Sequence, residues 1–242
     1  MAGTTRTPVP VLAAQGRGPG AARAARQRAV ANVRRSLVLA AARDAFFELG
    51  LQGASLREIA RRAGYTPGAL YSYFQSKEEV YGALLGESLE RLNEFVQAAA
   101  PSLRHSDAKT PRRRDVGDAV RAQATAFFDF YRQNPRDLDL GFYLFHGMQP
   151  RGLTPALNDR LNTRLRDALA PARDGLLALG LPADEAQAEV TALFAHMVGL
   201  LLLSHTGRIR MFRQQSQVLF ERYLDALLSR AAPPSSHRSM RA

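Results

Sequence analysis

The sequence contains no cysteine, so it forms no disulfide bond and offers no thiol for catalysis. It also lacks a glycine-rich phosphate loop and a G-x-S-x-G nucleophile elbow, and no histidine begins an H-E-x-x-H pattern. His196 and His205 are the closest approach to a metal-ligand pair, but their spacing is not that of a zinc site. These absences predict a protein that is not an enzyme, and they predict neither a metal site nor a cofactor.

Acidic residues are absent before Asp44, whereas arginine recurs throughout that stretch. The whole chain carries a net charge of +11, and Lys77 and Lys109 are its only lysines. Such an excess of positive charge favours a polyanionic partner. Residues 1–28 are rich in Ala, Gly, Pro and Arg, which predicts a disordered basic arm. Two roles stay open for this arm: a tail without function, or a contact along DNA phosphates or in the minor groove.

Long hydrophobic runs are also missing, and no signal peptide is evident. The most apolar run, Ala192 to Leu203, is about 12 residues long, which is short of the roughly 20 that cross a bilayer. The sequence therefore predicts a soluble, cytoplasmic protein that is associated with the nucleoid and has no membrane partner.

Residues 55–77 contain the pattern of a helix-turn-helix, in which two short helices meet at a tight turn. The Ser55 hydroxyl is positioned to cap the first helix, and Glu58 three residues later completes a capping box. Gly64 follows the last turn and suits the left-handed conformation that ends a helix. Four apolar residues at helical spacing form the inward stripe: Leu56, Ile59, Ala60 and Ala63.

The second helix of this pattern is the candidate recognition helix, which would enter the DNA major groove. Thr66 caps it, and Pro67 occupies the first position, where its missing N–H costs nothing. Leu70 and Phe74 face inward, one turn apart. The outer side then carries Gly68, Ala69, Tyr71, Ser72 and Tyr73. Small residues let the backbone approach the groove, and tyrosine hydroxyls donate to phosphates or meet base edges.

A third helix is predicted to begin at Ser76, which makes another capping box with Glu79. Lys77 lies at the N-terminus of that helix, with its amine free for a phosphate. The alternative interpretation of the whole pattern is a helical hairpin inside an ordinary all-α core, whose aromatic side chains only pack.

From Arg34 to Leu85 the sequence resembles the DNA-binding head of the TetR family of bacterial transcriptional regulators. The resemblance rests on the segments RRSLVLAAARDAFFELG, SLREIARRAG, TPGALYSYF and SKEEV. It implies that Ser55 and Lys77 anchor phosphates, and that Arg57 reaches a base or a phosphate. It also implies that the groove is lined by Thr66, Pro67, Gly68, Ala69, Tyr71 and Tyr73. Tyr73 stands where many members carry histidine, so a base preference at that position does not transfer.

Helical periodicity continues through the rest of the chain, without strand-like alternation or repeats. Helices are predicted over 30–49, 76–99, 116–133, 135–147, 154–179, 182–206 and 209–230. The predicted fold is all-α: an N-terminal three-helix helix-turn-helix head, then a larger helical body for ligand binding and dimerisation. The predicted divisions are 1–28 (disordered basic arm), 29–78 (DNA-binding domain), 79–230 (ligand-binding and dimerisation domain) and 231–242 (disordered tail).

The helix over 182–206 becomes apolar on every side in its second half, so nearly all of it must be covered. The predicted cover is a four-helix interface between two copies of the chain, which the family resemblance also implies. The predicted interface residues are Leu193, Met197, Leu200, Leu201, Val218, Leu219, Tyr223 and Leu227. The alternative is that the rest of the same chain covers this helix. Two-fold symmetry would place two recognition helices roughly 34–36 Å apart and predicts a palindromic operator.

Aromatic residues are dense between Phe127 and Met148, and several histidines lie on or near apolar helices. The predicted pocket lining is Phe127, Tyr131, Phe142, Tyr143, His146, Gln149 and His196. These side chains are expected to hold a hydrophobic or aromatic small molecule. The alternative is an aromatic core in which the histidines are satisfied structurally.

Together these patterns predict a homodimeric regulator of transcription that binds double-stranded DNA. Its expected role is that of a repressor, which releases a palindromic operator when a small ligand binds. The second interpretation is an activator or architectural DNA-binding protein of the same shape without an inducer, and the third is a helical hydrolase or lyase.

Overall fold

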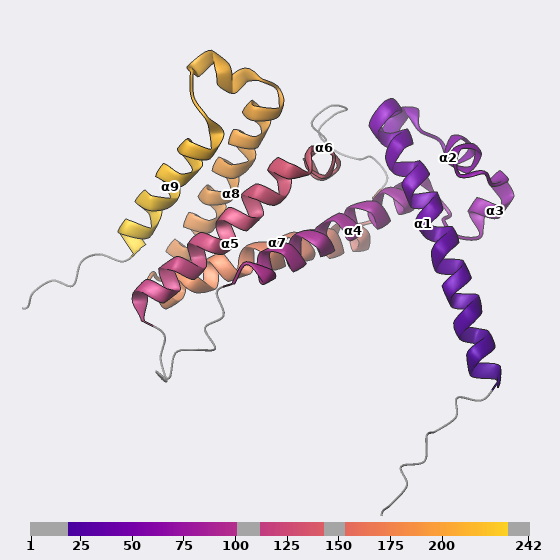
Figure 1. Cartoon of the computed structure of the whole chain (residues 1–242), viewed down its shortest axis with the longest axis horizontal. Helices are drawn as coiled ribbons and strands as arrows, with labels where there is room; N and C mark the ends of the chain where they lie inside the picture. Colours follow the sequence, from indigo (N-terminus) through magenta and orange to yellow (C-terminus); the bar gives the residue numbers. More distant parts are fainter. Residues whose placement is uncertain (1–18, 101–111, 143–152, 232–242) are drawn as a thin grey trace, which may run out of the picture.

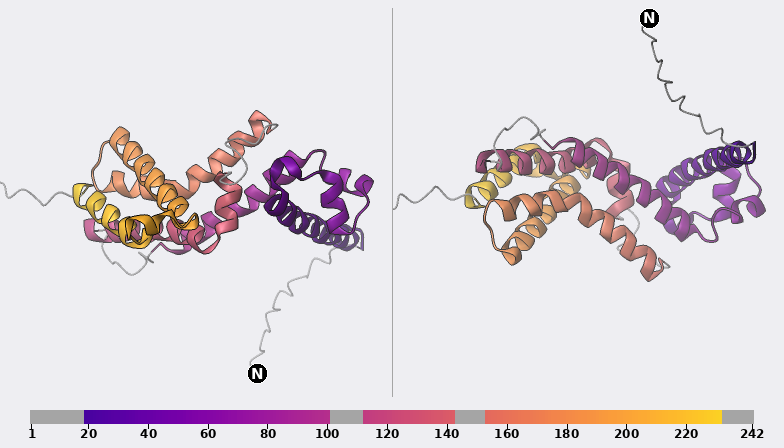
Figure 2. Two further views of the ribbon diagram at one scale, coloured as in Figure 1. Left: turned by 90° about the horizontal axis from the view of Figure 1, so that it is seen from above. Right: turned by 90° about the horizontal axis from the view of Figure 1, so that it is seen from below.

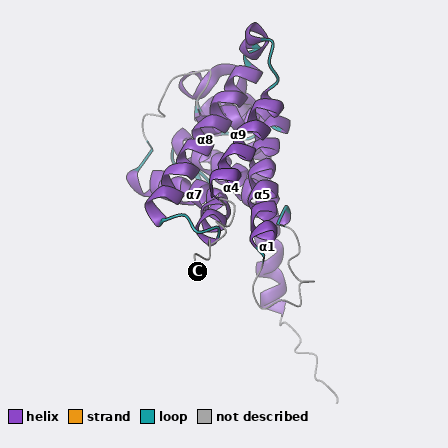
Figure 3. Cartoon of the chain, turned by 90° about the vertical axis from the view of Figure 1, so that its left-hand side faces the viewer, coloured by secondary structure: helices purple, strands orange, loops and turns teal. Residues whose placement is uncertain are grey.

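The computed structural model describes residues 19–100, 112–142 and 153–231, and over these ranges the chain is helical without any strand (Figures 1 and 3). The head consists of α1 (Pro19–Gly53), α2 (Leu56–Ala63) and α3 (Pro67–Tyr71). The body consists of α4 (Lys77–Ala98), α5 (Arg113–Gln133), α6 (Pro135–Phe142), α7 (Pro155–Ala178), α8 (Ala183–His205) and α9 (Ser216–Ala231). The predicted all-α fold is confirmed.

The head and the body lie at opposite ends of an elongated molecule and are joined by α4 (Figures 1 and 2). α4 packs on α1 in the head and on α5 and α7 in the body. Its buried residues recur at helical spacing, among them Val80, Leu84, Leu92 and Val96. One continuous helix thus contributes to both cores.

Two glycines one turn apart let α7 approach α4 closely. A Cβ atom on Gly82 would lie 2.6 Å from Cδ2 of Leu157, and one on Gly86 would lie 2.5 Å from Nη1 of Arg164. The guanidinium of Arg164 also pairs with Glu90 of α4 at 2.6 Å. The tight seam between α4 and α7 therefore depends on the absence of side chains at these two positions.

α1 begins at Pro19, well before the predicted helix start at residue 30, so residues 19–28 are not disordered as expected. Alanine and arginine dominate this stretch, and both have high helix propensity. Every side chain from residue 23 to residue 37 is exposed, and this part of the helix projects beyond the rest of the head (Figure 1). Gly50, with a φ of 70°, interrupts the helix next to its predicted end at Leu49.

Two boundaries near the C-terminus also differ from the sequence prediction. The helix expected over 135–147 runs from Pro135 to Phe142, and residues 143–152 lie outside the described residues. The last helix begins at Ser216 rather than at residue 209, because Gly207 and Arg213 both have positive φ and enclose a separate 3-10 turn, Arg208–Phe212. Of the tail expected from residue 231, only the helical Ala231 lies within the described residues.

α8 packs against α5, α7 and α9 of its own chain. Five predicted interface residues are buried there: Leu193, Met197, Leu200, Leu201 and Leu227. This burial corrects the interface prediction for these five, because their own chain covers them and a second copy would not reach them. The other three retain exposed surface: Val218, Leu219 and Tyr223. For these three the interface stays a prediction.

α8 is also the one helix among the described residues that is long and apolar enough to cross a membrane, with a mean hydropathy of 1.6 over its most apolar window. The sequence prediction considered only the run from 192 to 203 and so underestimated this length. Core helices of soluble proteins have the same composition. In this chain α8 packs against three helices of the body, and 33% of its most apolar window is buried among the described residues.

Gly175 offers a test of how tightly α5 and α7 pack, because a Cβ atom there would overlap the fully buried Val120. We expect Gly175→Ala to lower the free energy of unfolding by about 1–3 kcal/mol. At roughly 2–4 °C per kcal/mol, the melting temperature falls by several degrees.

The matched control is Gly117→Ala in α5, where a Cβ atom would meet nothing within 4 Å. Alanine in a helix is more favourable than glycine by roughly 0.5–1 kcal/mol, so this variant should melt slightly higher than the parent. Equal shifts for the two variants in differential scanning calorimetry would contradict the described helix packing.

Candidate nucleic-acid interface and cavity

The helix-turn-helix is held in shape by hydrogen bonds at its helix ends. Oγ of Ser55 accepts from the Glu58 amide at 3.2 Å. Oγ1 of Thr66 accepts from the Ala69 amide at 3.3 Å. Gly64 between the two helices has a φ of 73°, a left-handed conformation that L side chains rarely adopt. The predicted caps and the predicted turn are therefore present, and they orient α3 relative to α2.

α3 presents a mostly exposed outer side. Tyr71 is 57% exposed, and a Cβ atom on Gly68 would meet nothing within 4 Å. The other exposed members of the predicted contact set are Ser55, Arg57, Thr66, Pro67 and Ser72. Ala69 and Tyr73 are half-buried, and Tyr73 also packs against the core. Behind this surface, Leu70 and Phe74 are 1% and 3% exposed, so they anchor the helix from the inside as predicted.

Lys77 differs from its predicted state. Its ammonium group donates to the carbonyl oxygen of Leu51 at 2.9 Å, so the amine is not free. This bond joins the N-terminus of α4 to the end of α1. The two residues lie far apart in the sequence, so the sequence pattern did not predict the contact. A phosphate contact by Lys77 would have to replace this bond or share the ammonium protons with it.

Glu58 also differs from its predicted role. Its carboxylate accepts from Nε of Arg61 at 2.8 Å and from Nε of Arg62 at 2.7 Å, instead of turning back to the helix start. Arg62 further pairs with Glu48 of α1 at 2.7 Å. The hydrogen bonds from Arg61 and then Arg62 lower the pKa of the Glu58 carboxyl from 4.5 to about 2. The ionised carboxylate thus links α2 to α1 through Arg62.

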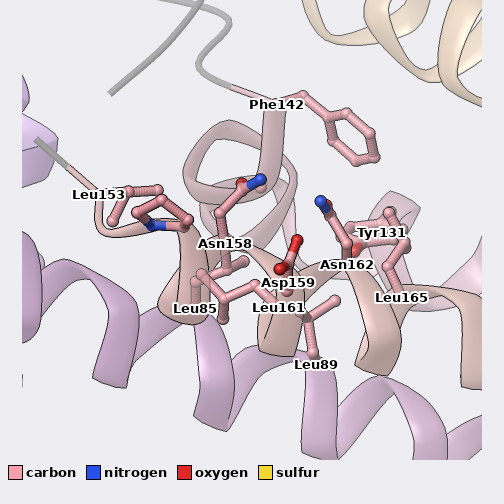
Figure 4. Close-up of a pocket in the computed structure, with 12 residues that line it drawn as sticks. Leu85, Leu89, Tyr131, Phe142, Leu153, Asn158, Asp159, Leu161, Asn162 and Leu165 are labelled. Atoms are coloured by element: carbon pink, nitrogen blue, oxygen red, sulfur yellow. The ribbon is translucent and has the colours of Figure 1, made fainter. Parts of the chain in front are cut away.

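A cavity of about 470 Å³ opens between α4, α6 and α7 (Figure 4). Its apolar wall includes Leu85, Leu89, Phe142, Leu153, Leu161 and Leu165. Its polar groups come from α7, namely Asn158, Asp159 and Asn162, and from Tyr131 of α5. In Figure 4, Asn158, Asp159 and Asn162 point from α7 toward the side of the cavity where Phe142 lies. The cavity thus combines leucine side chains with a group of polar side chains, and sites for small molecules combine the same two kinds of lining.

The Tyr131 hydroxyl is the most deeply placed polar group of this cavity. Burial raises its pKa, and the negative charge of Asp137 raises it further, so the phenol stays protonated. The ring packs edge-on against Phe127 and Phe142, with centroids 5.3 and 5.7 Å away. A protonated phenol at the wall can donate a hydrogen bond to a ligand acceptor.

The predicted pocket residues divide into three groups. Tyr131 and Phe142 line the cavity, whereas Phe127 lies behind it in the core at 1% exposure. Tyr143, His146 and Gln149 lie outside the described residues. His196 is not among the lining residues: it stacks on Tyr223 of α9, with ring centroids 4.3 Å apart. Sequence reasoning missed the polar α7 group, although its members follow one helical face beside the leucines (Asn158, Asp159, Asn162).

α6 links the cavity to the head. Its last residues, Gly141 and Phe142, line the cavity. At its other end, the Arg136 guanidinium lies 4.4 Å from the centre of the Phe47 ring in α1 and pairs with Asp44 at 3.5 Å.

α4 holds α6 at two further points. Nη2 of Arg91 lies 2.6 Å from the Asp137 carboxylate, and the Tyr81 hydroxyl donates to the carbonyl oxygen of Leu140 at 2.5 Å. α6 therefore contacts both α4 and α1.

The fold and this geometry define the class of the protein: a helix-turn-helix head, joined by a shared helix to a helical body with a cavity. The chain belongs to the TetR family. The family model for bacterial regulatory proteins of the tetR family matches residues 38–84, and that for the tetracyclin repressor-like C-terminal domain matches residues 120–227. The relatives and similar folds are regulators of transcription, not enzymes.

The HTH-type transcriptional activator FasR of Mycolicibacterium smegmatis is 34% identical over 109 residues, which are 45% of each chain. The match thus spans about half of that relative. The HTH-type transcriptional regulator BetI of Yersinia pestis is 26% identical over 201 residues, covering 81% of this chain and 93% of its own.

Among solved structures, the regulatory protein SCO4313 has a TM-score of 0.65 at 21% identity, covering 84% of this chain and 98% of its own. The complex of SmeT with triclosan has a TM-score of 0.58 at 21% identity, covering 82% and 91%. At these identities the likeness concerns the fold.

The lowered pKa of Glu58 predicts how the head responds to acid. Its ionised form stabilises the folded state at pH values above 4.5, and this contribution is lost as the pH falls toward about 2. We therefore expect Glu58→Gln to melt below the parent at neutral pH and the difference to shrink on acidification. Added salt should shrink it too, because the group is near solvent.

Glu94→Gln is the matched control, since Glu94 is exposed and forms no ion pair among the described residues. A gap between the parent and Glu58→Gln that is independent of pH in thermal unfolding by circular dichroism would contradict the assigned ion pairs. So would an equal gap for the control.

Proposed function

We propose that the protein is a transcriptional repressor that binds a palindromic operator as a homodimer and releases it when a small molecule occupies the cavity. The observation that carries the DNA-binding part is the exposed outer side of α3, with Tyr71 presented to solvent while Leu70 and Phe74 anchor the helix from behind. An exposed tyrosine on a short, capped helix that follows a tight turn is well placed to contact bases or phosphates in a DNA groove.

In this proposal the recognition surface has two parts. Ser55 and Lys77 hold phosphates, and Arg57 reaches a phosphate or a base. The groove is contacted by Thr66, Pro67, Gly68, Ala69, Tyr71, Ser72 and Tyr73. The open space around Gly68 supports a close backbone approach. The Ser72 hydroxyl already donates to the carbonyl of Ala69 at 2.7 Å, so its contact with DNA would be made as an acceptor.

The outer faces of α8 and α9 are the proposed dimer interface. Val218 is 45% exposed, and Leu219 and Tyr223 keep part of their surface. On α8, a Cβ atom on Gly199 would meet nothing within 4 Å of its own chain. This open position supports a close approach of a second copy. Dimerisation is typical of the family, which agrees with this proposal. We expect this dimer to be soluble, cytoplasmic and associated with the nucleoid.

The proposed effector is a small hydrophobic or aromatic molecule. The leucine wall of the cavity supports an apolar body, and Tyr131 and the α7 polar group support one or two hydrogen-bonding atoms. That SmeT has been solved with triclosan shows a fold of this kind holding an aromatic ligand. An activator is the second candidate, because FasR, which is 34% identical over part of its length, is named an activator.

Release requires that the ligand bind the non-binding conformation more tightly than the DNA-binding one, since only this difference shifts the equilibrium. The proposed route is the movement of Phe142 and α6, transmitted to α1 by Arg136 and to α4 by Tyr81 and Arg91.

The DNA-binding proposal is tested by selection of duplexes from fragmented genomic DNA at low ionic strength. We expect an enriched palindrome whose half-sites lie about one helical turn apart. On that duplex, Tyr71→Phe should weaken binding at least about twofold, because one hydrogen bond is worth about 0.5–1.5 kcal/mol. Fluorescence anisotropy measures the dissociation constants.

Tyr65→Phe is the control for Tyr71→Phe, since Tyr65 is half-buried and packs against the core. It should bind like the parent. Failure to enrich any palindrome, or normal binding by Tyr71→Phe, would overturn the assignment of the α3 surface.

The coupling route predicts that Arg136→Ala separates ligand binding from DNA release. An exposed ion pair and a cation–π contact are together worth about 1 kcal/mol. For a compound that raises the melting temperature in a thermal-shift screen, the ligand-induced loss of operator affinity should therefore shrink by about fivefold. The compound's own affinity in isothermal titration should change little in the absence of DNA.

Arg132→Ala is the matched control, because Arg132 pairs only with Asp129 of its own helix α5 among the described residues. It should keep the full ligand effect. Equal coupling in both variants would mean that α6 does not act on the head through Arg136.

A further inference from the structure

The N-terminal half of α1 is left largely uncovered by the other described residues. From residue 23 to residue 37 every side chain is exposed, and the helix projects beyond the head (Figures 1 and 2). It is a direct continuation of the buried half, which packs on α2 and α4. Since the buried half supplies the helical nucleus, the alanine-rich extension needs no nucleation of its own. The extension can therefore be helical without packing against another part of the protein.

The charge of this extension has one sign. It carries Arg23, Arg26, Arg28, Arg34 and Arg35, and no acidic residue precedes Asp44. None of Arg23, Arg26 and Arg34 forms an ion pair among the described residues. A duplex carries one negative charge per roughly 1.7 Å along its axis. The extension therefore matches a nucleic-acid backbone in charge.

The extension begins beside the candidate recognition surface. The guanidinium of Arg35 lies 4.7 Å above the ring of Phe74, the inner anchor that follows α3. Sixteen helical residues precede Arg35, and at 1.5 Å per residue they reach about 24 Å further. Arg28 lies two turns before Arg35 and so points to the same side of the helix, whereas Arg23, Arg26 and Arg34 point to the opposite side. A duplex bound to α3 would thus continue past this helix.

We propose that the N-terminal half of α1 is a second DNA-binding element, which contacts phosphates of the duplex flanking the operator. The proposal rests on the DNA-binding function proposed above and adds to it a surface outside the helix-turn-helix. Its contacts are with the backbone, so they add affinity and salt dependence without reading sequence.

A second copy of the helix is the competing occupant, because Val30, Val33 and Leu37 are exposed on one side of it. Arg23, Arg26 and Arg34 share that side by helical spacing. Pairing two such helices would bring like charges together, which costs free energy. The same arrangement is favourable beside phosphates, with the arginine stems covering the apolar residues.

The test compares the full chain with the variant R23Q/R26Q/R28Q on two duplexes. One is the shortest palindrome recovered by selection, and the other carries about ten extra base pairs on each side, roughly 34 Å. Glutamine keeps a helix propensity close to that of arginine, and circular dichroism checks that helix content is unchanged. The control variant, R114Q/R160Q/R208Q, removes the same charge from exposed arginines of the body.

The full chain and the control should bind the long duplex more tightly than the short one, at least about tenfold at low salt. The R23Q/R26Q/R28Q variant should lose this gain and still bind the short duplex. Each lost phosphate contact lowers the slope of log K against log salt by about 0.9. Arg23 and Arg26 share one side of the helix, so two lost contacts in each of two subunits would lower it by up to about 4 on the long duplex.

Equal affinity of the full chain for both duplexes would overturn this inference and leave the proposed operator binding intact. So would a loss shared by the control, which would indicate net charge alone. A variant that keeps DNA binding but loses self-association in sedimentation would assign the helix to a second copy. If the full chain enriches no duplex at all, the proposed function and this inference both fall.

Discussion

The outer surface of α3 depends on one constraint, which is the burial of Leu70 and Phe74 in the core of the head. α3 is only Pro67–Tyr71, too short to be stable as an isolated helix. It is held because these two side chains are almost fully buried and because Gly64 and Thr66 set the turn and the cap. Fixing the inner side leaves Tyr71 nowhere to pack, so it faces solvent.

The connection between the head and the body likewise depends on buried side chains. α4 shares its buried side between both cores, so no separate hinge joins the two halves. Glycines at 82 and 86 let α7 lie against this helix, which brings the cavity wall next to it. α6 adds a second path, because Arg136 reaches α1 while Phe142 lines the cavity. Contacts of this kind are individually weak, so the proposed coupling would need several of them to act together.

Among the described residues, charge is distributed differently in the N-terminal half of α1 and in the rest of the chain. The exposed N-terminal half of α1 has arginines and no carboxylate. In the rest of the head and in the body, by contrast, many arginines are matched by acids: Arg62 by Glu48 and Glu58, Arg91 by Asp137, Arg164 by Glu90. Matched arginines stabilise helix contacts, whereas unmatched ones remain available to an anion. The overall excess of positive charge is therefore concentrated where it would act on DNA.

The sequence by itself determined the all-helical fold, the helix-turn-helix with its caps, and most helix bounds, because these depend on local periodicity and on residues within one turn of each other. The tertiary structure decided what each apolar or charged group meets. It buried Leu193 and Met197 in their own chain, gave Lys77 the carbonyl of Leu51, and brought Asn158 and Asn162 to a cavity with Tyr131. These outcomes join residues far apart in the chain, and helical spacing specifies which side a residue takes but not which helix covers it.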